Sequence, residues 1–260
     1  MTLKPKHIQQ LTTLGYLAVG LLGILLIISA VERKGENRII DVLIQVDRLP
    51  DGSMLTKKQD ILLLIDRSFG YPLNSIPVKE VDMERLERVL EEDPFILNAE
   101  AYIDAKNQLS IGIVQREPVI RVMDNNGLNY YMDKEGVKMK TSEHSSPHVL
   151  VLTGNLPPHS TDFLDPRKEH VLKDLFYLAE IIREDGFLHP MIEQVHVSNR
   201  NEITLIPKIG NQKIFFGRPR DVEDKLSRLK TFYREAAPYE GWRKYRSLDL
   251  RYDGQVVAKR

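Results

Sequence analysis

The chain has 260 residues, of which 42% are hydrophobic, so it is long enough for one or two domains with apolar cores. Its 37 basic residues balance its 37 acidic residues. Without a concentrated positive field, nucleic acid is not an expected partner. The sequence contains no cysteine, which excludes disulfides, thiolate zinc sites and thiol nucleophiles.

The first long element is an uncharged segment over residues 11–31, LTTLGYLAVGLLGILLIISAV. At about 1.5 Å of helix rise per residue, a segment of this length crosses a hydrocarbon core of roughly 30 Å. We therefore expect a tail over residues 1–10 and a transmembrane helix over residues 11–31. The alternative is a cleaved signal peptide, and Ile28-Ser29-Ala30 resembles a cleavage site weakly.

The charges that flank this segment do not settle its orientation. Lys4 and Lys6 lie before it, while Arg33, Lys34 and Arg38 follow it, so the positive-inside rule gives no answer. The short N-terminal tail and the bulk of the chain beyond the helix favour a cytoplasmic tail with an exported C-terminal part.

The first exported region, residues 38–116, begins with an alternating apolar run at 39–46 that predicts a strand. Thr56, followed by Gln59, has the spacing of a capping box, and it predicts a helix that ends before Gly70. The runs at 99–103 and 109–114 predict a hairpin.

A second helix is expected between these elements. Asp82 can cap it, and Met83, Leu86, Val89 and Leu90 form its apolar face, with Glu87 among the residues of the polar face. The expected order of the region is therefore β-α-α-β-β.

The second region, residues 117–260, alternates apolar runs with turn residues, which predicts an antiparallel sheet. Two helices, one from Pro166 and one from Asp221, have apolar residues at helical spacing, as in helices that pack on a core. The fold class is thus α+β: an N-terminal transmembrane helix, a β-α-α-β-β domain and a C-terminal mixed β domain with two packing helices.

Motifs for catalysis are not found in the sequence. His144 and His148 are four residues apart, but Pro147 between them indicates a loop, and no third metal ligand follows at a metalloprotease spacing. Trp242 to Arg246, WRKYR, has the composition of an anion-binding surface, although a half-buried surface is the simpler interpretation. We expect no enzyme activity, cofactor, metal site or small-molecule substrate.

The final residues, SLDLRYDGQVVAKR, predict two strands around a two-residue turn at Asp253-Gly254. Leu248 and Leu250 are expected to face the core, and the returning strand spans Gln255 to Lys259. A strand added last to a sheet is commonly an edge with unpaired backbone groups. Either Lys259 and Arg260 protect this edge, or a partner uses it.

Markers along nearly the whole chain resemble those of the FtsQ/DivIB family of bacterial cell-division proteins, whose exported part begins with a POTRA domain. The helix and strand around DMERLERVLEEDPFILNAEAYI are similar to that domain. Further similarity lies in the R-E-P and D-x-x-G motifs, in the run VLVLTG at 149–154 and in the closing strands. The marker residues are Leu90, Pro94, Ile96, Ala99, Arg116, Glu117, Pro118, Asp133 and Gly136.

The resemblance implies a non-enzymatic scaffold of the divisome, located in the inner membrane at the division septum with most of the chain in the periplasm. It implies partners of the FtsB (DivIC) and FtsL types and a link to septal peptidoglycan synthesis. In this family the closing strand docks a partner segment by strand addition. The positions that match it here are Tyr252, Gln255, Val256, Val257, Ala258 and Lys259.

Two other classes of protein remain as alternatives. A membrane-anchored periplasmic enzyme or glycan-binding protein would carry its site in the loops of the second region. A POTRA-bearing assembly factor of the outer membrane would need a long C-terminal β-barrel, for which this length leaves no room.

Overall fold

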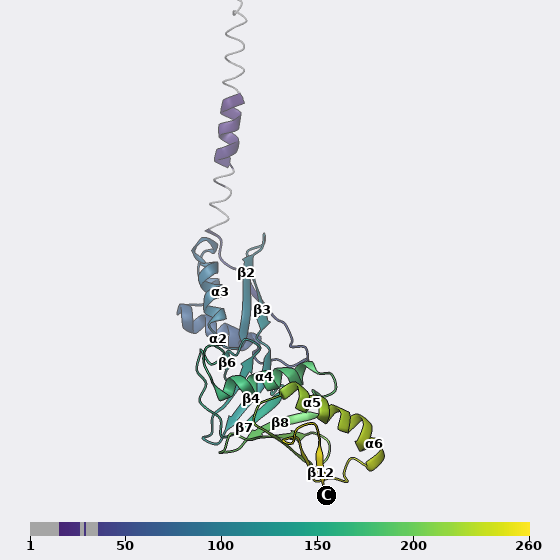
Figure 1. The fold of residues 1–260 in the computed structure, drawn as a ribbon. Helices are drawn as coiled ribbons and strands as arrows, with labels where there is room; N and C mark the ends of the chain where they lie inside the picture. The colour runs from purple at the N-terminus through teal and green to yellow at the C-terminus, as the bar shows by residue number, and fades with distance from the viewer. Residues whose placement is uncertain (1–15, 27–28, 30–35) are drawn as a thin grey trace, which may run out of the picture. The chain divides into compact units, whose positions relative to one another are not determined.

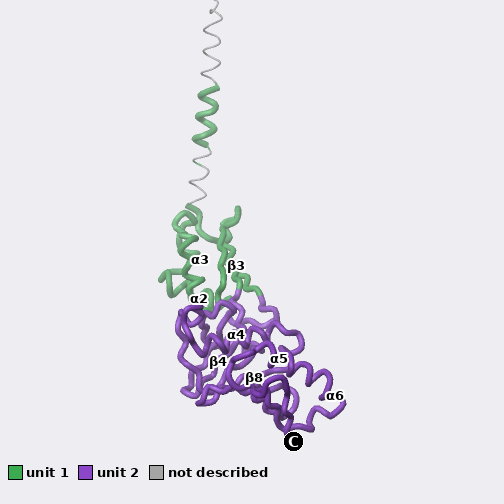
Figure 2. The backbone as a smooth tube through the Cα atoms, viewed as in Figure 1, with its two compact units in different colours: residues 1–47, 57–114 green, residues 48–56, 115–260 purple. Residues whose placement is uncertain are grey.

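The computed structural model describes residues 16–26, 29 and 36–260. The chain divides into two compact units, which Figure 2 shows in different colours. The smaller unit comprises residues 1–47 and 57–114, and the larger comprises residues 48–56 and 115–260. Each unit has its own hydrophobic core.

The apolar segment expected to span a membrane is described only in part. Residues 16–26 form a helix with exposed apolar side chains, among them Tyr16, which is 79% exposed. The remainder of the expected 11–31 span, apart from residue 29, lies outside the described residues, as does the expected tail. Within the described part of the chain, no helix combines the length and the hydropathy needed to cross a membrane.

The smaller unit has the predicted β-α-α-β-β order (Figure 1). Strand β3 lies between β1 and β2, and it pairs with β1 in parallel, with Ile44 opposite Ile111. Two 3₁₀ turns, Leu73–Ser75 and Val78–Glu80, separate the helices. The elements are β1 (Asp41–Val46), α2 (Lys58–Phe69), α3 (Met83–Glu91), β2 (Ile96–Ile103) and β3 (Gln108–Gln115).

The start of α2 corrects the predicted capping box. Lys57, not Thr56, is the N-cap residue, and the Asp60 carboxylate accepts the Lys57 N–H at 2.8 Å. Thr56 is buried, and its own N–H donates to Oε1 of Gln115 at 3.2 Å. The Thr56 backbone is therefore held by a residue distant in sequence, which local spacing could not reveal.

Helix α3 is capped as predicted, but one of its residues was placed wrongly. Asp82 accepts the Arg85 N–H at 2.9 Å, and Leu86 and Leu90 are fully buried. Glu87, expected on the solvent face, instead accepts the Ala101 N–H of β2 at 2.7 Å. Its substitution is consequently not a neutral surface change.

The larger unit is built on a nine-stranded sheet in the order β12-β11-β10-β9-β8-β7-β4-β5-β6. The expectation of an antiparallel sheet is wrong, because three neighbouring pairs, β4 with β7, β7 with β8 and β10 with β11, are parallel. The strands are β4 (Pro118–Asp124), β5 (Asn129–Asp133), β6 (Lys138–Met139), β7 (Leu150–Gly154), β8 (Ile192–Val197), β9 (Ile203–Pro207), β10 (Lys213–Gly217), β11 (Ser247–Asp249) and β12 (Val257–Lys259).

The helices of the larger unit explain two of these parallel pairs. Parallel neighbours need a crossover connection; α4 (Val171–Glu184) connects β7 to β8, and α5 (Val222–Thr231) begins the connection from β10 to β11. A π-helical turn, Phe232–Ala236, and α6 (Ala237–Glu240) continue α5. Residues of α4 and α5 share one core with the sheet, and Figure 1 shows both helices across it.

The start of α4 differs from the prediction, while the expected start of α5 is confirmed. Helix α4 begins at Val171 instead of Pro166, because residues 165–168 form a turn in which the Asp165 carbonyl accepts the Lys168 N–H. His170 then caps the helix through Nδ1, which accepts the Leu172 N–H. In α5, Asp221 precedes the first helical residue as predicted.

Candidate functional site: the edge strand of the larger sheet

Strand β12 lies at one edge of the nine-stranded sheet (Figure 1). It pairs antiparallel with β11, with Ser247 opposite Lys259, Leu248 opposite Ala258 and Asp249 opposite Val257. Leu248 and Leu250 are fully buried, which confirms that they face the core. The edge position is therefore as the sequence indicated, but the strand is shorter than the expected 255–259.

The prediction of a two-residue turn at Asp253-Gly254 is also wrong. Residues 250–256 form a longer connection between β11 and β12. The guanidinium of Arg228, in α5, donates to the carbonyl oxygens of Tyr252 at 2.8 Å and of Gln255 at 2.5 Å. These carbonyls have a side-chain donor in place of a cross-strand one, so the connection does not need tight hairpin pairing.

Of the six predicted site residues, Val257, Ala258 and Lys259 form β12, while Tyr252, Gln255 and Val256 lie in the connection before it, and their environments differ. Val256 and Ala258 are partly buried against the core. Gln255 and Lys259 are exposed, and Tyr252 is 50% exposed. These residues therefore include side chains anchored in the protein and polar groups accessible to solvent.

Backbone alternation shows which peptide group of β12 points away from the sheet. The Leu250 N–H donates to the Phe215 carbonyl at 2.9 Å, and the Arg246 carbonyl accepts the Lys213 N–H at 3.0 Å. The even-numbered residues of β11 thus point their backbone groups toward β10, and Ser247 and Asp249 point theirs toward β12.

It follows that the partners of Ser247 and Asp249, Lys259 and Val257, direct their backbone groups back toward β11. At the end of this pair, the Lys259 carbonyl also accepts the N–H of Arg246, the residue before β11, at 2.8 Å. Ala258, which lies between them, directs its N–H and C=O toward the open edge. Within the described part of the chain, no side chain bonds to these two groups of Ala258.

An ion pair supports the start of this connection. Asp249 is buried, and Nη2 of Arg251 lies 2.7 Å from its Oδ2, while Nε lies 2.9 Å from Oδ1. The Arg251 guanidinium holds the pKa of Asp249 below its ordinary value. The same guanidinium lies over the ring of Phe215, 5.4 Å from its centroid.

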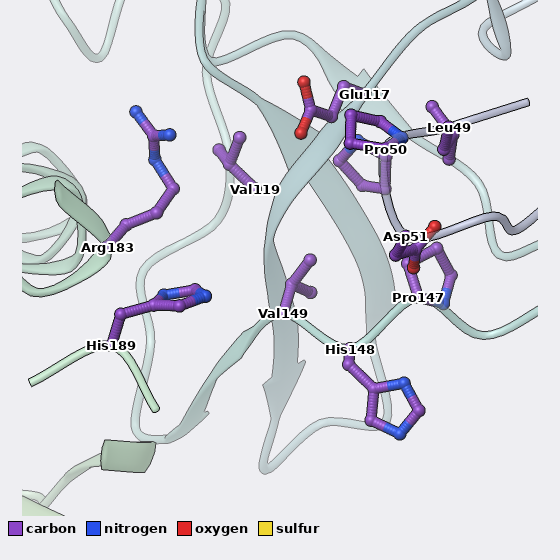
Figure 3. A pocket seen from close by; sticks show the side chains of 11 residues that line it. Leu49, Pro50, Asp51, Glu117, Val119, Pro147, His148, Val149, Arg183 and His189 are labelled. Carbon is purple, nitrogen blue, oxygen red and sulfur yellow. The ribbon is translucent and has the colours of Figure 1, made fainter. Parts of the chain in front are cut away.

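A separate hollow of about 250 Å³ lies in the larger unit, and Figure 3 shows it. Arg183 and His189 lie on one side of it, and Leu49 and Pro147 lie on the other. Arg183 is already engaged, since its Nε and Nη2 both donate to Glu180. The other lining residues are Pro50, Asp51, Glu117, Pro118, Val119, His148 and Val149.

The histidine pair considered as a metal site lies in a loop, as Pro147 indicated. His148 lines the hollow of Figure 3, whereas His144 does not. Among the described residues, no group of three or more His, Cys, Asp or Glu side chains is arranged to hold a metal ion.

Comparison with known proteins identifies the larger unit. Residues 117–259, more than half of the chain, match the family described as FtsQ/DivIB, C-terminal related. The chain belongs to the FtsQ/DivIB family. Residues 41–114 match the POTRA-like domain, so the predicted POTRA resemblance is confirmed along with that of the family.

A curated relative supports this assignment. The chain is 26% identical over 171 residues to a protein of Chloroflexus aurantiacus named "Cell division protein FtsQ". The match covers 65% of this chain and 60% of the relative. The chain therefore matches less than two thirds of the length of that FtsQ protein.

The FtsQ/DivIB markers of the larger unit have a shared structural role. Nη1 of Arg116, in the R-E-P motif, lies 2.6 Å from Oδ2 of Asp133, which begins the D-x-x-G motif. Oδ1 of the same carboxylate accepts the N–H groups of Glu135 and Val137 and thereby shapes the β5–β6 turn. Gly136 has φ 76°, and a Cβ there would lie 2.7 Å from Leu164 Cδ1.

Three of the POTRA markers belong to the core of the smaller unit, while Pro94 is only partly buried. Leu90 and Ile96 are fully buried, and Ala99 is 3% exposed. Sequence reasoning missed Arg228, which shapes the connection to the candidate edge, and Gln115, which holds the backbone before α2. Both act on backbone groups far away in the sequence, so no local spacing could have indicated them.

Proposed function

We propose that the chain is a non-enzymatic scaffold of the bacterial cell-division apparatus, which binds an extended segment of an FtsB (DivIC)-type partner by strand addition to β12. Membership of the FtsQ/DivIB family supports the cell-division role. The observation that carries the docking edge is Ala258, whose N–H and C=O point away from β11 at the end of the sheet order. Strand addition uses such backbone groups for affinity.

The rest of the proposed contact surface follows from the predicted positions. Tyr252, Gln255 and Lys259 present exposed side chains beside the edge, where an incoming strand would contact them. Val256 and Ala258 pack inward and hold the strand against the core. Val257, which lies between them, pairs with Asp249 of β11.

We assign the remaining parts of the chain as the sequence indicated. Residues 1–10 form a cytoplasmic tail, and residues 11–31 form one transmembrane helix in the inner membrane. The POTRA domain spans residues 38–116, and the C-terminal β domain spans residues 117–260. The scaffold acts at the division septum, with FtsL-type proteins as further partners, and connects them to septal peptidoglycan synthesis.

Proline substitution along β12 tests the docking edge, with binding of the purified FtsB-type protein to the full-length chain measured in detergent. Ala258→Pro removes the outward N–H and should abolish binding with little loss of stability, because an edge tolerates proline toward solvent. Val257→Pro removes an inward N–H, so its main effect should be on stability. Ala258→Ser keeps the N–H and is the matched control.

Truncation before Gln255 gives a second measurement. It should abolish binding and leave both units folded, with a loss of roughly 1–2 kcal/mol for the partly buried Val256 and Ala258 side chains. If Ala258→Pro and the truncated chain bind as well as the parent, the edge is not the docking site. If the truncated chain unfolds, β12 is required by the sheet and the proposal fails in this form.

A further inference from the structure

The smaller unit has an edge strand of its own, β2, at the end of the order β1-β3-β2. The Asp104 N–H donates to the Gln108 carbonyl at 3.0 Å, across the turn to β3. Because backbone groups alternate along a strand, the even-numbered residues of β2 point toward β3. The odd-numbered residues from 97 to 103 point toward the outer edge.

Two of these outward N–H groups are occupied by carboxylates of α3. The Ala101 N–H donates to Glu87 Oε1 at 2.7 Å, and the Ala99 N–H donates to Glu91 Oε1 at 3.2 Å. Residues four apart on a helix are separated by about 6 Å along its axis. Alternate residues on a strand are separated by nearly the same distance, about 6.8 Å, so one helix face can follow the edge.

The packing of α3 explains how the two carboxylates reach the strand. Leu86 and Leu90 are fully buried beneath the helix, and Figure 1 shows α3 beside β2. The two residues that donate these N–H groups, Ala99 and Ala101, carry only a methyl side chain. Ala99 is only 3% exposed, so a larger residue there would push the helix away from the edge.

The strand beneath this cover has the properties of a reactive edge. Leu97 is 46% exposed and Tyr102 is 63% exposed, and β2 is eight residues long. Long edge strands with exposed apolar side chains pair readily with other chains unless something blocks them. The sequence of β2, ILNAEAYI, contains one charged residue and no proline. The strand's own side chains therefore give little protection against pairing with another strand.

We propose that Glu87 and Glu91 form a carboxylate latch that closes the β2 edge and prevents the smaller unit from pairing, strand to strand, with a second copy of the chain. The latch works by occupying the two central outward N–H groups, so an incoming strand finds no donors there. It does not depend on the proposed use of β12, where the outward groups of Ala258 have no such cover within the described residues.

A matched pair of double variants separates hydrogen bonding from charge. Glu87→Ala with Glu91→Ala removes both acceptors, whereas Glu87→Gln with Glu91→Gln removes the same two charges and keeps an amide oxygen at each position. Both are made in the full-length chain, in detergent, with Ala258→Pro also present so that β12 does not contribute to pairing.

The first measurement is hydrogen exchange in peptides that cover residues 96–103. The alanine pair should exchange about tenfold faster than the parent, because two amides lose their acceptors, and the glutamine pair should stay close to the parent. The second is sedimentation velocity, in which the alanine pair should form dimers as concentration rises and the glutamine pair should stay monomeric.

A cysteine at an exposed position of β2 locates the new contact. Asn98→Cys gives a unique thiol, since the chain has none, and it should cross-link between copies in the alanine pair alone. The latch is rejected if the alanine pair exchanges and sediments as the parent does, or if both pairs associate equally. If the alanine pair unfolds, Glu91→Ala alone must show the faster exchange at residue 99, and its absence rejects the latch.

Discussion

Arg116 and Asp133 are joined by a short ion pair, with Nη1 2.6 Å from Oδ2. The side chain of Asp133 is only 2% exposed and that of Arg116 is 17% exposed. The pair connects Arg116, two residues before β4, to the start of the turn between β5 and β6, so two motifs of the family are one structural unit.

Removing one member of this pair should destabilise the larger unit. Asp133→Asn can keep the turn hydrogen bonds but removes the carboxylate charge that pairs with Arg116, and removing one partner costs roughly 3–5 kcal/mol in buried pairs. We expect a clear fall in the urea midpoint of the larger unit. Glu135→Gln, at an exposed position of the same turn, is the control, and equal midpoints for both variants would mean that the pair contributes nothing to stability.

The buried face of α3 gives a second prediction. Leu86 is fully buried, so Leu86→Asp places an unpaired charge in the core of the smaller unit and should unfold it, at a cost of several kcal/mol. Arg88→Gln, on the exposed side of the same helix, should change stability by less than about 0.5 kcal/mol. Thermal unfolding of both variants measures the difference, and an unchanged midpoint for Leu86→Asp contradicts the packing described above.

The Asp249–Arg251 pair predicts a dependence of stability on pH. The pKa of Asp249 is lowered by the hydrogen bond from Arg251, so its contribution is complete above the unfolded pKa of about 3.9. The contribution is lost as pH falls through the lowered folded value. Because the Arg251 side chain is 44% exposed, we expect no more than about 1 kcal/mol.

Comparison of the parent with Asp249→Asn over pH 2–7 checks this sign. The difference between their unfolding midpoints should be largest near neutral pH and should shrink toward zero as Asp249 becomes protonated. Asp253→Asn, which removes an exposed carboxylate from the same connection, is the matched control. A difference that grows with acidification would contradict the assignment.

Membrane topology is the fourth prediction. We expect residues 11–31 to be retained as an anchor, with the residues beyond about Glu32 in the periplasm. A fluorescent reporter that folds only in the cytoplasm, fused after Arg260, should be dark, and a periplasmic enzyme reporter at the same position should be active. A mature protein whose N-terminus is Val31 would show cleavage instead of anchoring.

Local patterns predicted most of the elements, since alternation and helical spacing are properties of neighbouring residues. The strands of the POTRA-like unit, the cap at Asp82 and the burial of Leu248 and Leu250 all follow from such patterns. The edge position of β12 was also predicted, because a strand added last commonly lies at the edge of a sheet.

The features that could not be predicted depend on contacts between distant residues. The width of the 250–256 connection is set by Arg228, more than twenty positions earlier. Glu87 was predicted to face solvent because helical spacing shows which residues share a face of the helix. It does not show which other element contacts that face, here β2. Parallel pairing was missed because alternation is the same in strands of either direction.

The order of strands in the larger sheet also constrains when the chain can recruit a partner. From β7 to β12, the strands lie side by side in the sheet in the same order in which they occur in the sequence. Ribosomes make the chain in that order, so the outermost strand is also the last of them to leave the ribosome. A chain whose synthesis stops before β12 therefore lacks the proposed edge. Under the proposed function, a partner could add its strand only after β12 has been made and paired with β11.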